Sequence, residues 1–573
     1  MKHQILENWK NGFRHDGLLY FAQRVDEMLF PFTEHVFKSP VLNTALLVDE
    51  YLKTAKLAKD GTINDNHLKQ IMDEFQASFN DDIVLKKHLE EEEKKRILHR
   101  LNCSSLEEQR RMMGYLKFLF SDYNLWCIQL LKELVPQEKE KKKIEKVIRY
   151  LIPGLISSGY SREYIYRYNK EIFFDNPVES IDSLYLFLNR FDFKNRQYDI
   201  YIAIDNNAIE YQKVLEKKLD VSFGPFEESM GLEYNREQFR LIKLQIESFD
   251  EQSAAWEAYD RLNIFFQYYR FLTETEESWF FKTAKVEDVK GNTSFVNLKV
   301  TGLNYSKEKG RQNWAILSEY FISALRKNAM QSYIQINRAI NAHNTAINDS
   351  SIRNRFLNLW STLEIVFVSD QSDSKCSEII RKMAPILQND FLHYLFSSVE
   401  ISINEIFEKS ELNPLLDQLD EEDRKHALVL IIALDKYSKI REELCDLLTD
   451  YPLVRSRIKR LHELCSNKKE LQKAIDQYTQ RIKWHITRLY RTRNTIIHSG
   501  INPENLRELV DHLHSYCDEC LFEIVFLLSS KPQLESISNA LIYDELLAEK
   551  NLAMLQEKAA VNKTEIIALL FLE

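Results

Sequence analysis

The amino-acid sequence predicts an α+β protein that is predominantly helical. The 573-residue chain contains only 12 glycines and 11 prolines, about 2 % each against typical usage of about 7 % and 5 %. Turns and sheets use these residues more than helices do, so their scarcity favours long helices. Apolar residues recur at helical spacing through most of the chain, whereas between about residues 180 and 305 they alternate with polar ones.

The length of the chain predicts several domains, because single cores stop growing near ~250–300 residues. The expected division is a helical N-terminal domain at 1–178, a small mixed α/β domain at 179–310, a helical domain at 311–535 and a helical C-terminal tail at 536–573.

In the N-terminal domain, the stretches 18–32 and 112–134 carry apolar residues three or four positions apart, which predicts helices. One helix is expected to end at Gly159, and the next to begin with Ser161 as its N-cap. Helical hairpins are common in α proteins, so this one is only weak support for a DNA-binding motif.

The mixed domain is predicted because the spacing of apolar residues changes from three or four positions to two. Large aliphatic residues occupy every second position of 199–205 and of 242–247, as they do in strands. A hairpin is expected to join 279–289 to 295–300 through the intervening turn, and a helix is expected over 254–272.

After the mixed domain the helical period returns. The expected helices are 313–344, 353–368, 377–387, 424–437, 454–464, 471–497 and 505–528.

Charge and composition narrow the class of protein. A net charge of −10 argues against a chain that coats nucleic acid with its whole surface, but it allows a local basic site. Seven scattered cysteines fit reduced thiols better than a disulfide scaffold. The sequence shows no signal-peptide apolar region and no run of the ~18–20 apolar residues that a membrane span needs. We therefore expect a cytoplasmic protein without a membrane partner.

One segment is locally basic. Residues 451–500 contain twelve lysines and arginines but three acidic residues. A solvated basic helix is the plain interpretation, but positive charge interleaved with aromatic rings also suits single-stranded RNA. The expected RNA-binding residues are Lys483, Arg488, Tyr490 and Arg491.

The basic segment ends in a motif that could carry chemistry. Arg493 and Asn494 precede His498, and Gly500 is a good helix terminator, so His498 is expected in the last helical turn. Histidine exchanges protons near neutral pH, and a guanidinium offsets charge on a phosphate. Attack of a ribose 2′-OH on the neighbouring phosphate could use both groups without a metal.

Spacing alone does not single out this motif, because four Arg/His pairs have the same separation. Of the arginines in these pairs, only Arg493 is followed by asparagine. Only the Arg493/His498 pair is expected at the C-terminal end of a long basic helix. The four pairs are Arg338/His343, Arg457/His462, Arg493/His498 and Arg507/His512.

The pattern Arg-Asn-x-x-x-His-Ser-Gly at a helix end, followed by a further helix, resembles the signature of HEPN domains, particularly the ApeA-like group. Residues 355–364 resemble the early helix of that fold, and the resemblance covers roughly 345–530. It implies a helical bundle that dimerises and cleaves RNA without a metal or other cofactor. Arg493 and His498 would be catalytic, with Asn494 and, as a weaker carry-over, Glu364 in support.

The resemblance also implies a biological setting. Many HEPN proteins are toxins or act in antiviral defence and abortive infection. The expected partners are single-stranded RNA or tRNA and a second copy of the chain, with a phage-derived molecule or a nucleotide as activator. Two alternatives stay open: a catalytically silent HEPN-type module that binds RNA, nucleotides or a protein, and a structural protein whose basic helix contacts an acidic partner.

Metal and nucleotide chemistry have weaker support in the sequence. Cys517 and Cys520, with His512 and His514 nearby, could bind zinc, but within a helix the two cysteines are expected to share its buried face. The acidic residues at 81–82 lack the flanking strand of a magnesium nuclease. No glycine-rich phosphate loop is present. The sequence therefore predicts no metal and no cofactor.

Overall fold

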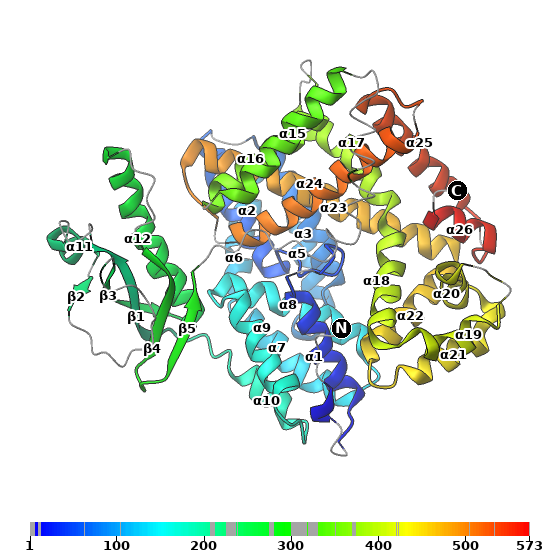
Figure 1. Cartoon of the computed structure of the whole chain (residues 1–573), viewed down its shortest axis with the longest axis horizontal. Helices are drawn as coiled ribbons and strands as arrows, with labels where there is room; N and C mark the ends of the chain where they lie inside the picture. Colours follow the sequence, from blue (N-terminus) through cyan, green and yellow to red (C-terminus); the bar gives the residue numbers. More distant parts are fainter. Residues whose placement is uncertain are drawn as a thin grey trace. The chain divides into compact units, whose positions relative to one another are not determined.

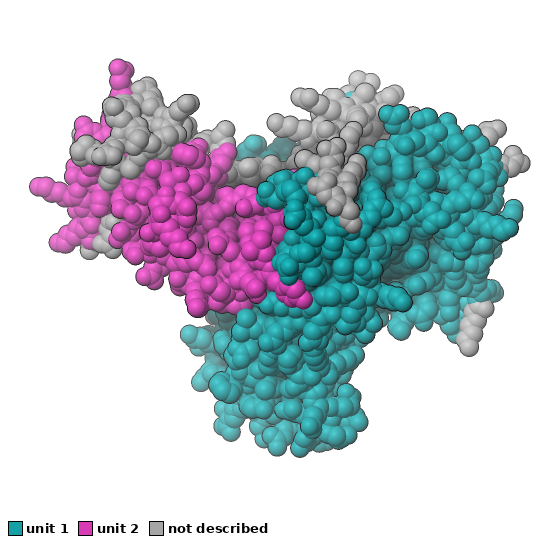
Figure 2. Space-filling model, turned by 90° about the horizontal axis from the view of Figure 1, so that it is seen from below, with its two compact units in different colours: residues 1–153, 173–184, 302–573 teal, residues 154–172, 185–301 magenta. Residues whose placement is uncertain are grey.

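The computed structural model describes residues 6–9, 13–31, 33–61, 64–103, 105–206, 212–219, 221–224, 237, 239–273, 280–298, 318, 330–349, 351–369, 374–419, 421, 423–503, 505–531, 533–557 and 559–571. The chain divides into two compact units, which Figure 2 colours separately. Residues 1–153, 173–184 and 302–573 form the first unit, and residues 154–172 and 185–301 the second. The first unit thus combines both ends of the chain. The four-domain division stays a prediction.

The predicted fold class is confirmed: helices predominate, and the described residues contain one five-stranded antiparallel sheet (Figure 1). The predicted stretch 112–134 is divided between two helices by a turn at 120–122, and Phe32 lies outside the described residues. The elements before the sheet are η1 (Glu7–Trp9), α1 (Asp16–Leu29), α2 (Thr44–Lys59), α3 (Asn66–Asp81), α4 (Ile83–His88), α5 (Glu91–Cys103), α6 (Leu106–Leu119), α7 (Tyr123–Leu134), η2 (Val135–Gln137), α8 (Lys141–Ser158), α9 (Arg162–Lys170), η3 (Glu171–Asp175) and α10 (Asp182–Asn189).

The elements after the sheet complete the first unit. The predicted helix 313–344 appears as α15 from Met330 onward, and its earlier part falls outside the described residues except for Ser318. The elements are α15 (Met330–Asn348), α16 (Ile352–Phe367), α17 (Lys375–Asn389), α18 (Phe391–Ile406), α19 (Lys409–Leu416), α20 (Arg424–Ala433), η6 (Asp435–Tyr437), α21 (Ser438–Leu447), α22 (Pro452–Cys465), α23 (Lys468–Ser499), α24 (Leu506–Ser530), α25 (Ile537–Met554) and α26 (Lys563–Phe571). Across the described parts of the chain, no helix is long and apolar enough to cross a membrane.

The sheet of the second unit has the strand order β2-β3-β1-β4-β5. Ile202 of β1 lies opposite Ile242 of β3 and Ala284 of β4, and all three are buried. The predicted helix 254–272 is present as α12, which lies along the sheet (Figure 1). The elements are β1 (Arg196–Asp205), α11 (Gln212–Leu219), β2 (Ser222–Phe223), β3 (Phe239–Ser248), α12 (Glu251–Thr273), β4 (Phe280–Asp288) and β5 (Thr293–Asn297).

The predicted hairpin is confirmed over the described residues. Strands β4 and β5 pair antiparallel, with Thr283 opposite Asn297, and Gly291 in their turn has a φ of 82°. The positive φ suits glycine because it has no Cβ. Trp279 and residues 299–300, which the prediction also included, lie outside the described residues.

The predicted junction at Gly159 is also confirmed. Helix α8 ends at Ser158, Gly159 has a φ of 113°, and the Ser161 side chain accepts a hydrogen bond from the Tyr164 N–H as the N-cap of α9. A Cβ at Gly159 would lie 2.6 Å from the ring of Phe249. Both the backbone conformation and the close ring therefore require glycine at this position.

We predict that Gly159→Ala lowers the free energy of unfolding more than Gly291→Ala does. Both variants suffer the positive-φ cost of about 1–2 kcal/mol, but only residue 159 meets a neighbouring ring. Overpacking of this kind typically adds about 1–3 kcal/mol. Urea denaturation of the two variants measures the difference, and equal losses would contradict the close approach of Phe249.

Candidate functional site

The candidate site lies at the C-terminal end of α23. Gly500 follows the helix with a φ of 71°, and its N–H donates to the carbonyl of Ile496. The Arg353 side chain of α16 donates to the same carbonyl through Nη2 at 3.0 Å. Helix C-termini leave carbonyl groups without intrahelical partners, so these two donors fix the end of α23. The predicted helix end at Gly500 is confirmed.

His498 lies in the last turn of α23 and is exposed. Arg493 lies five residues earlier, a little over one turn of helix, and its side chain is 26 % exposed. The Arg493 Nη1 donates to Oδ1 of the adjacent Asn494 at 3.1 Å. An exposed imidazole and a partly exposed guanidinium therefore lie on successive turns at one helix end.

Glu364 of α16 supports Arg493 from a second helix. Its Oε1 lies 3.9 Å from Arg493 Nη2 and accepts a hydrogen bond from Trp360 Nε1 at 3.0 Å. The other carboxylate oxygen lies 3.9 Å from Nζ of Lys375. The structure thus brings together Glu364, Arg493 and Asn494, three of the residues that the sequence singled out.

Arg488 and Arg491 point into the protein. Both side chains are 6 % exposed. Arg488 bonds Glu50 of α2 at 3.1 Å and Glu74 of α3 at 2.6 Å, and Arg491 bonds Glu50 at 2.7 Å. These four side chains form a largely buried ion-pair network that joins α23 to two N-terminal helices. The two carboxylates engage both guanidinium groups, and RNA contact by Arg488 and Arg491 stays a prediction.

The other two predicted RNA-binding residues differ in exposure. Lys483 is exposed on α23. Tyr490 is half-buried, and its ring lies 5.8 Å from that of Trp360 and 5.9 Å from that of His67. Lys483 is therefore accessible to a polyanion, whereas Tyr490 also packs against two neighbouring rings.

Sequence reasoning missed the acidic half of the buried network. Glu50 and Glu74 are more than 400 positions from Arg488 in the chain, and nothing in their local sequence marks them as its partners. Although burial opposes ionisation, Arg488 and Arg491 lower the pKa of Glu50 to about 2. Glu50 is therefore a carboxylate at neutral pH, held ionised by two arginines.

The Cys-x-x-Cys pair of α24 behaves as predicted. Cys517 and Cys520 are both buried, and the Cys517 Sγ donates to the carbonyl of Leu359 at 3.4 Å. Burial raises the pKa of both thiols well above the usual range. The two cysteines are thus protonated and belong to the core of the first unit.

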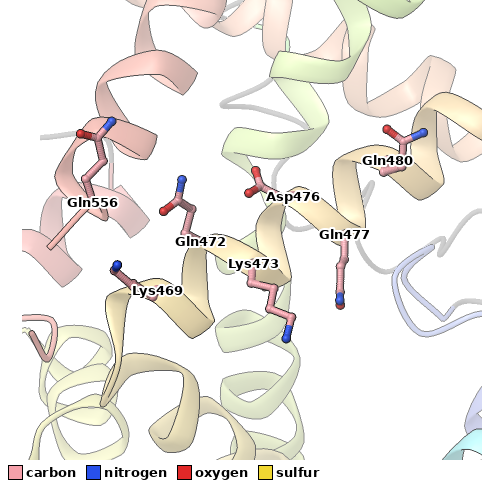
Figure 3. Close-up of a pocket in the computed structure, with 7 residues that line it drawn as sticks. All are labelled: Lys469, Gln472, Lys473, Asp476, Gln477, Gln480 and Gln556. Carbon is pink, nitrogen blue, oxygen red and sulfur yellow. The ribbon is translucent and has the colours of Figure 1, made fainter. Parts of the chain in front are cut away.

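A wide recess opens along the first half of α23, away from its C-terminal turn. Its volume is about 770 Å³. Figure 3 shows six of its residues on α23 and one just after α25: Lys469, Gln472, Lys473, Asp476, Gln477, Gln480 and Gln556. Its lining is polar and lacks a histidine, so it offers hydrogen bonds but no proton-transfer group of the kind that His498 provides.

No family model, no curated protein and no solved structure matches this chain. The resemblance to HEPN domains therefore stays a prediction from the motif residues of the sequence.

We predict that Glu50→Gln destabilises the protein more at pH 7 than at pH 3. The folded pKa of Glu50 is lowered, so its stabilisation is complete above the unfolded value of about 4.5 and is lost as pH falls toward 2. A pKa shift of this size contributes about 3 kcal/mol to the free energy of unfolding at pH 7 and roughly 1 kcal/mol at pH 3.

Urea unfolding of the wild type and of Glu50→Gln at the two pH values measures this effect. Glu443→Gln, which changes an exposed carboxylate on α21, serves as the matched control and should have little effect at either pH. A loss for Glu50→Gln that does not depend on pH would contradict the lowered pKa.

Proposed function

We propose that this protein is a metal-independent endoribonuclease that cleaves single-stranded RNA. The observation that carries the proposal is the exposed His498 on the last turn of α23, five residues after an Arg493 that contacts Glu364 and Asn494. This helix end thus offers a group that can transfer a proton and a group that can bind a phosphate.

The chemistry assigned to the site is transesterification. The ribose 2′-oxygen forms a bond to the adjacent phosphorus, the bond from phosphorus to the 5′-oxygen breaks, and a 2′,3′-cyclic phosphate remains. The 2′-OH loses a proton and the leaving 5′-oxygen gains one, and His498 performs one of these transfers. Arg493 offsets the negative charge that builds up on the phosphoryl oxygens.

The second proton-transfer group is assigned to another copy of the chain. A single copy offers one histidine at the end of α23, whereas the reaction requires a base and an acid. The HEPN resemblance supports a homodimer in which the two Arg493/His498 pairs form one composite site. The same resemblance supports a role as a growth-arresting effector in antiviral defence.

Lys483, which is exposed near the middle of α23, is assigned to RNA binding. Its charge attracts the phosphate backbone without selecting a sequence. Glu364 is a positioning residue rather than a catalytic one, because it acts on the substrate only through Arg493. Its Trp360 hydrogen bond orients the carboxylate toward that guanidinium.

We expect the purified wild-type protein to cleave labelled single-stranded RNA or tRNA in EDTA, leaving cyclic-phosphate ends. His498→Ala and Arg493→Ala should each lower the rate by at least about 100-fold, the usual size of a general acid–base contribution and of the loss of one group that stabilises transition-state charge. His99→Ala, which removes an exposed histidine on α5, should cleave like the wild type.

Equal cleavage by the wild type and His498→Ala would overturn the site. RNA binding without cleavage, unchanged by His498→Ala, would instead favour the catalytically silent module. Fluorescence anisotropy with the same RNA separates this outcome from a lack of binding, which would favour a structural protein that contacts an acidic partner.

We expect Glu364→Gln to lower kcat by about tenfold with little change in KM or Tm, because Gln keeps an acceptor for Trp360 but loses the charge that orients Arg493. A double-mutant cycle tests this mechanism. In the Arg493→Ala background, Glu364→Gln should have no further effect on kcat. An equal loss of kcat in both backgrounds would show that Glu364 does not act through Arg493.

A further inference from the structure

Three potential metal ligands converge where α15 meets α24. His343 comes from α15, whereas His514 and Asp518 lie four residues apart on one face of α24. Their ligand atoms all lie within 4.8 Å of one another. The Nε2 of His343 is 2.7 Å from Asp518 Oδ1, and Nδ1 of His514 is 3.8 Å from Asp518 Oδ2.

These distances suit a small tetrahedral ion. Bonds of about 2.0–2.1 Å from zinc to nitrogen or oxygen place neighbouring ligand atoms roughly 3.3 Å apart, between the two observed separations. Small rotations of the three side chains would therefore bring their donor atoms onto one ion. A water molecule would complete the fourth position.

An ordinary His–Asp ion pair explains the cluster less well. Although His343 Nε2 lies close to Asp518, it is buried and has no hydrogen-bond partner among the described residues, because the contact lacks hydrogen-bond geometry. The rings of His343 and His514 also stack, with centroids 4.8 Å apart and planes 17° from parallel. The two stacked imidazoles and the carboxylate together offer nitrogen and oxygen atoms that one cation can bind.

The surroundings shield the three donors from solvent. The His514 side chain is 2 % exposed, that of His343 12 % and that of Asp518 27 %. The Lys38 ammonium also faces this region, but it donates to Ser515 Oγ at 3.1 Å and to the carbonyl of Asp511 at 3.4 Å.

We propose that His343, His514 and Asp518 bind one divalent transition-metal ion, with Zn²⁺ as the preferred ion. Two imidazoles and one carboxylate suit Zn²⁺ and other divalent ions of the first transition series, whereas Mg²⁺ and Ca²⁺ prefer all-oxygen sites. The ion would link α15 to α24, two of the helices that pack against α16. The site is separate from the proposed nuclease centre and has a structural role.

The test is a titration of EDTA-treated, dialysed full-length protein with Zn²⁺ by calorimetry and with Co²⁺ by visible absorption. We expect one equivalent to bind per chain, with d–d bands of low-coordinate Co²⁺ and a Tm raised by several degrees. His343→Ala and Asp518→Asn should each weaken binding at least tenfold. Asp518→Asn nearly preserves side-chain shape, so it remains informative if His343→Ala fails to fold.

The matched control is His462→Ala. His462 also faces a carboxylate, with Nε2 3.1 Å from Asp435 Oδ1, but it does not belong to the cluster, so its loss should leave Zn²⁺ affinity unchanged. No binding by the folded wild type would overturn the proposal, and so would equal affinity in the wild type and Asp518→Asn. The titration contains no RNA, so its outcome does not depend on the proposed nuclease activity.

Discussion

The buried network of Arg488 and Arg491 with Glu50 and Glu74 ties the two ends of the chain into one unit. Removing such charges from water is costly, and their attraction offsets the cost only when both signs are present. Loss of the two carboxylates would therefore leave α23 with two uncompensated cations in a largely buried position. The N-terminal helices thus take part in forming the helix that bears the candidate site, which fits their membership of the same compact unit.

Because two arginines of the basic segment form internal ion pairs, fewer of its positive charges are available to a partner. The sequence between residues 451 and 500 has a surplus of nine positive charges, but a count of this kind does not separate inward from outward side chains. Arg488 and Arg491 are used internally, whereas Lys483, Arg493 and His498 stay accessible to different degrees. The exposed basic surface that could bind a polyanion is therefore smaller than the sequence suggests. It includes the helix end where the chemistry is proposed.

Local signals in the sequence predicted the fold class well, because they depend on residues close together in the chain. Glycine at positive φ marked the ends of α8 and α23, and apolar alternation marked the strands. Contacts between distant segments left no such mark. Neither the pairing of Glu50 with Arg488 nor the meeting of His343 with His514 could be predicted, since each depends on how helices pack. The HEPN resemblance named Glu364 as a supporting residue, but the sequence did not predict its contact with Arg493.

The end of α23 combines a fixed backbone with accessible side chains. Arg353 and Gly500 satisfy the Ile496 carbonyl, and Glu364 and Asn494 restrain Arg493, while His498 remains exposed. Groups that stabilise a transition state act best when they need little reorganisation as charge develops. Because α16 supplies both Arg353 and Glu364, the position of this one helix sets the geometry of the site. Any element that holds α16 in place, including α15 and α24, therefore contributes to how precisely Arg493 is presented.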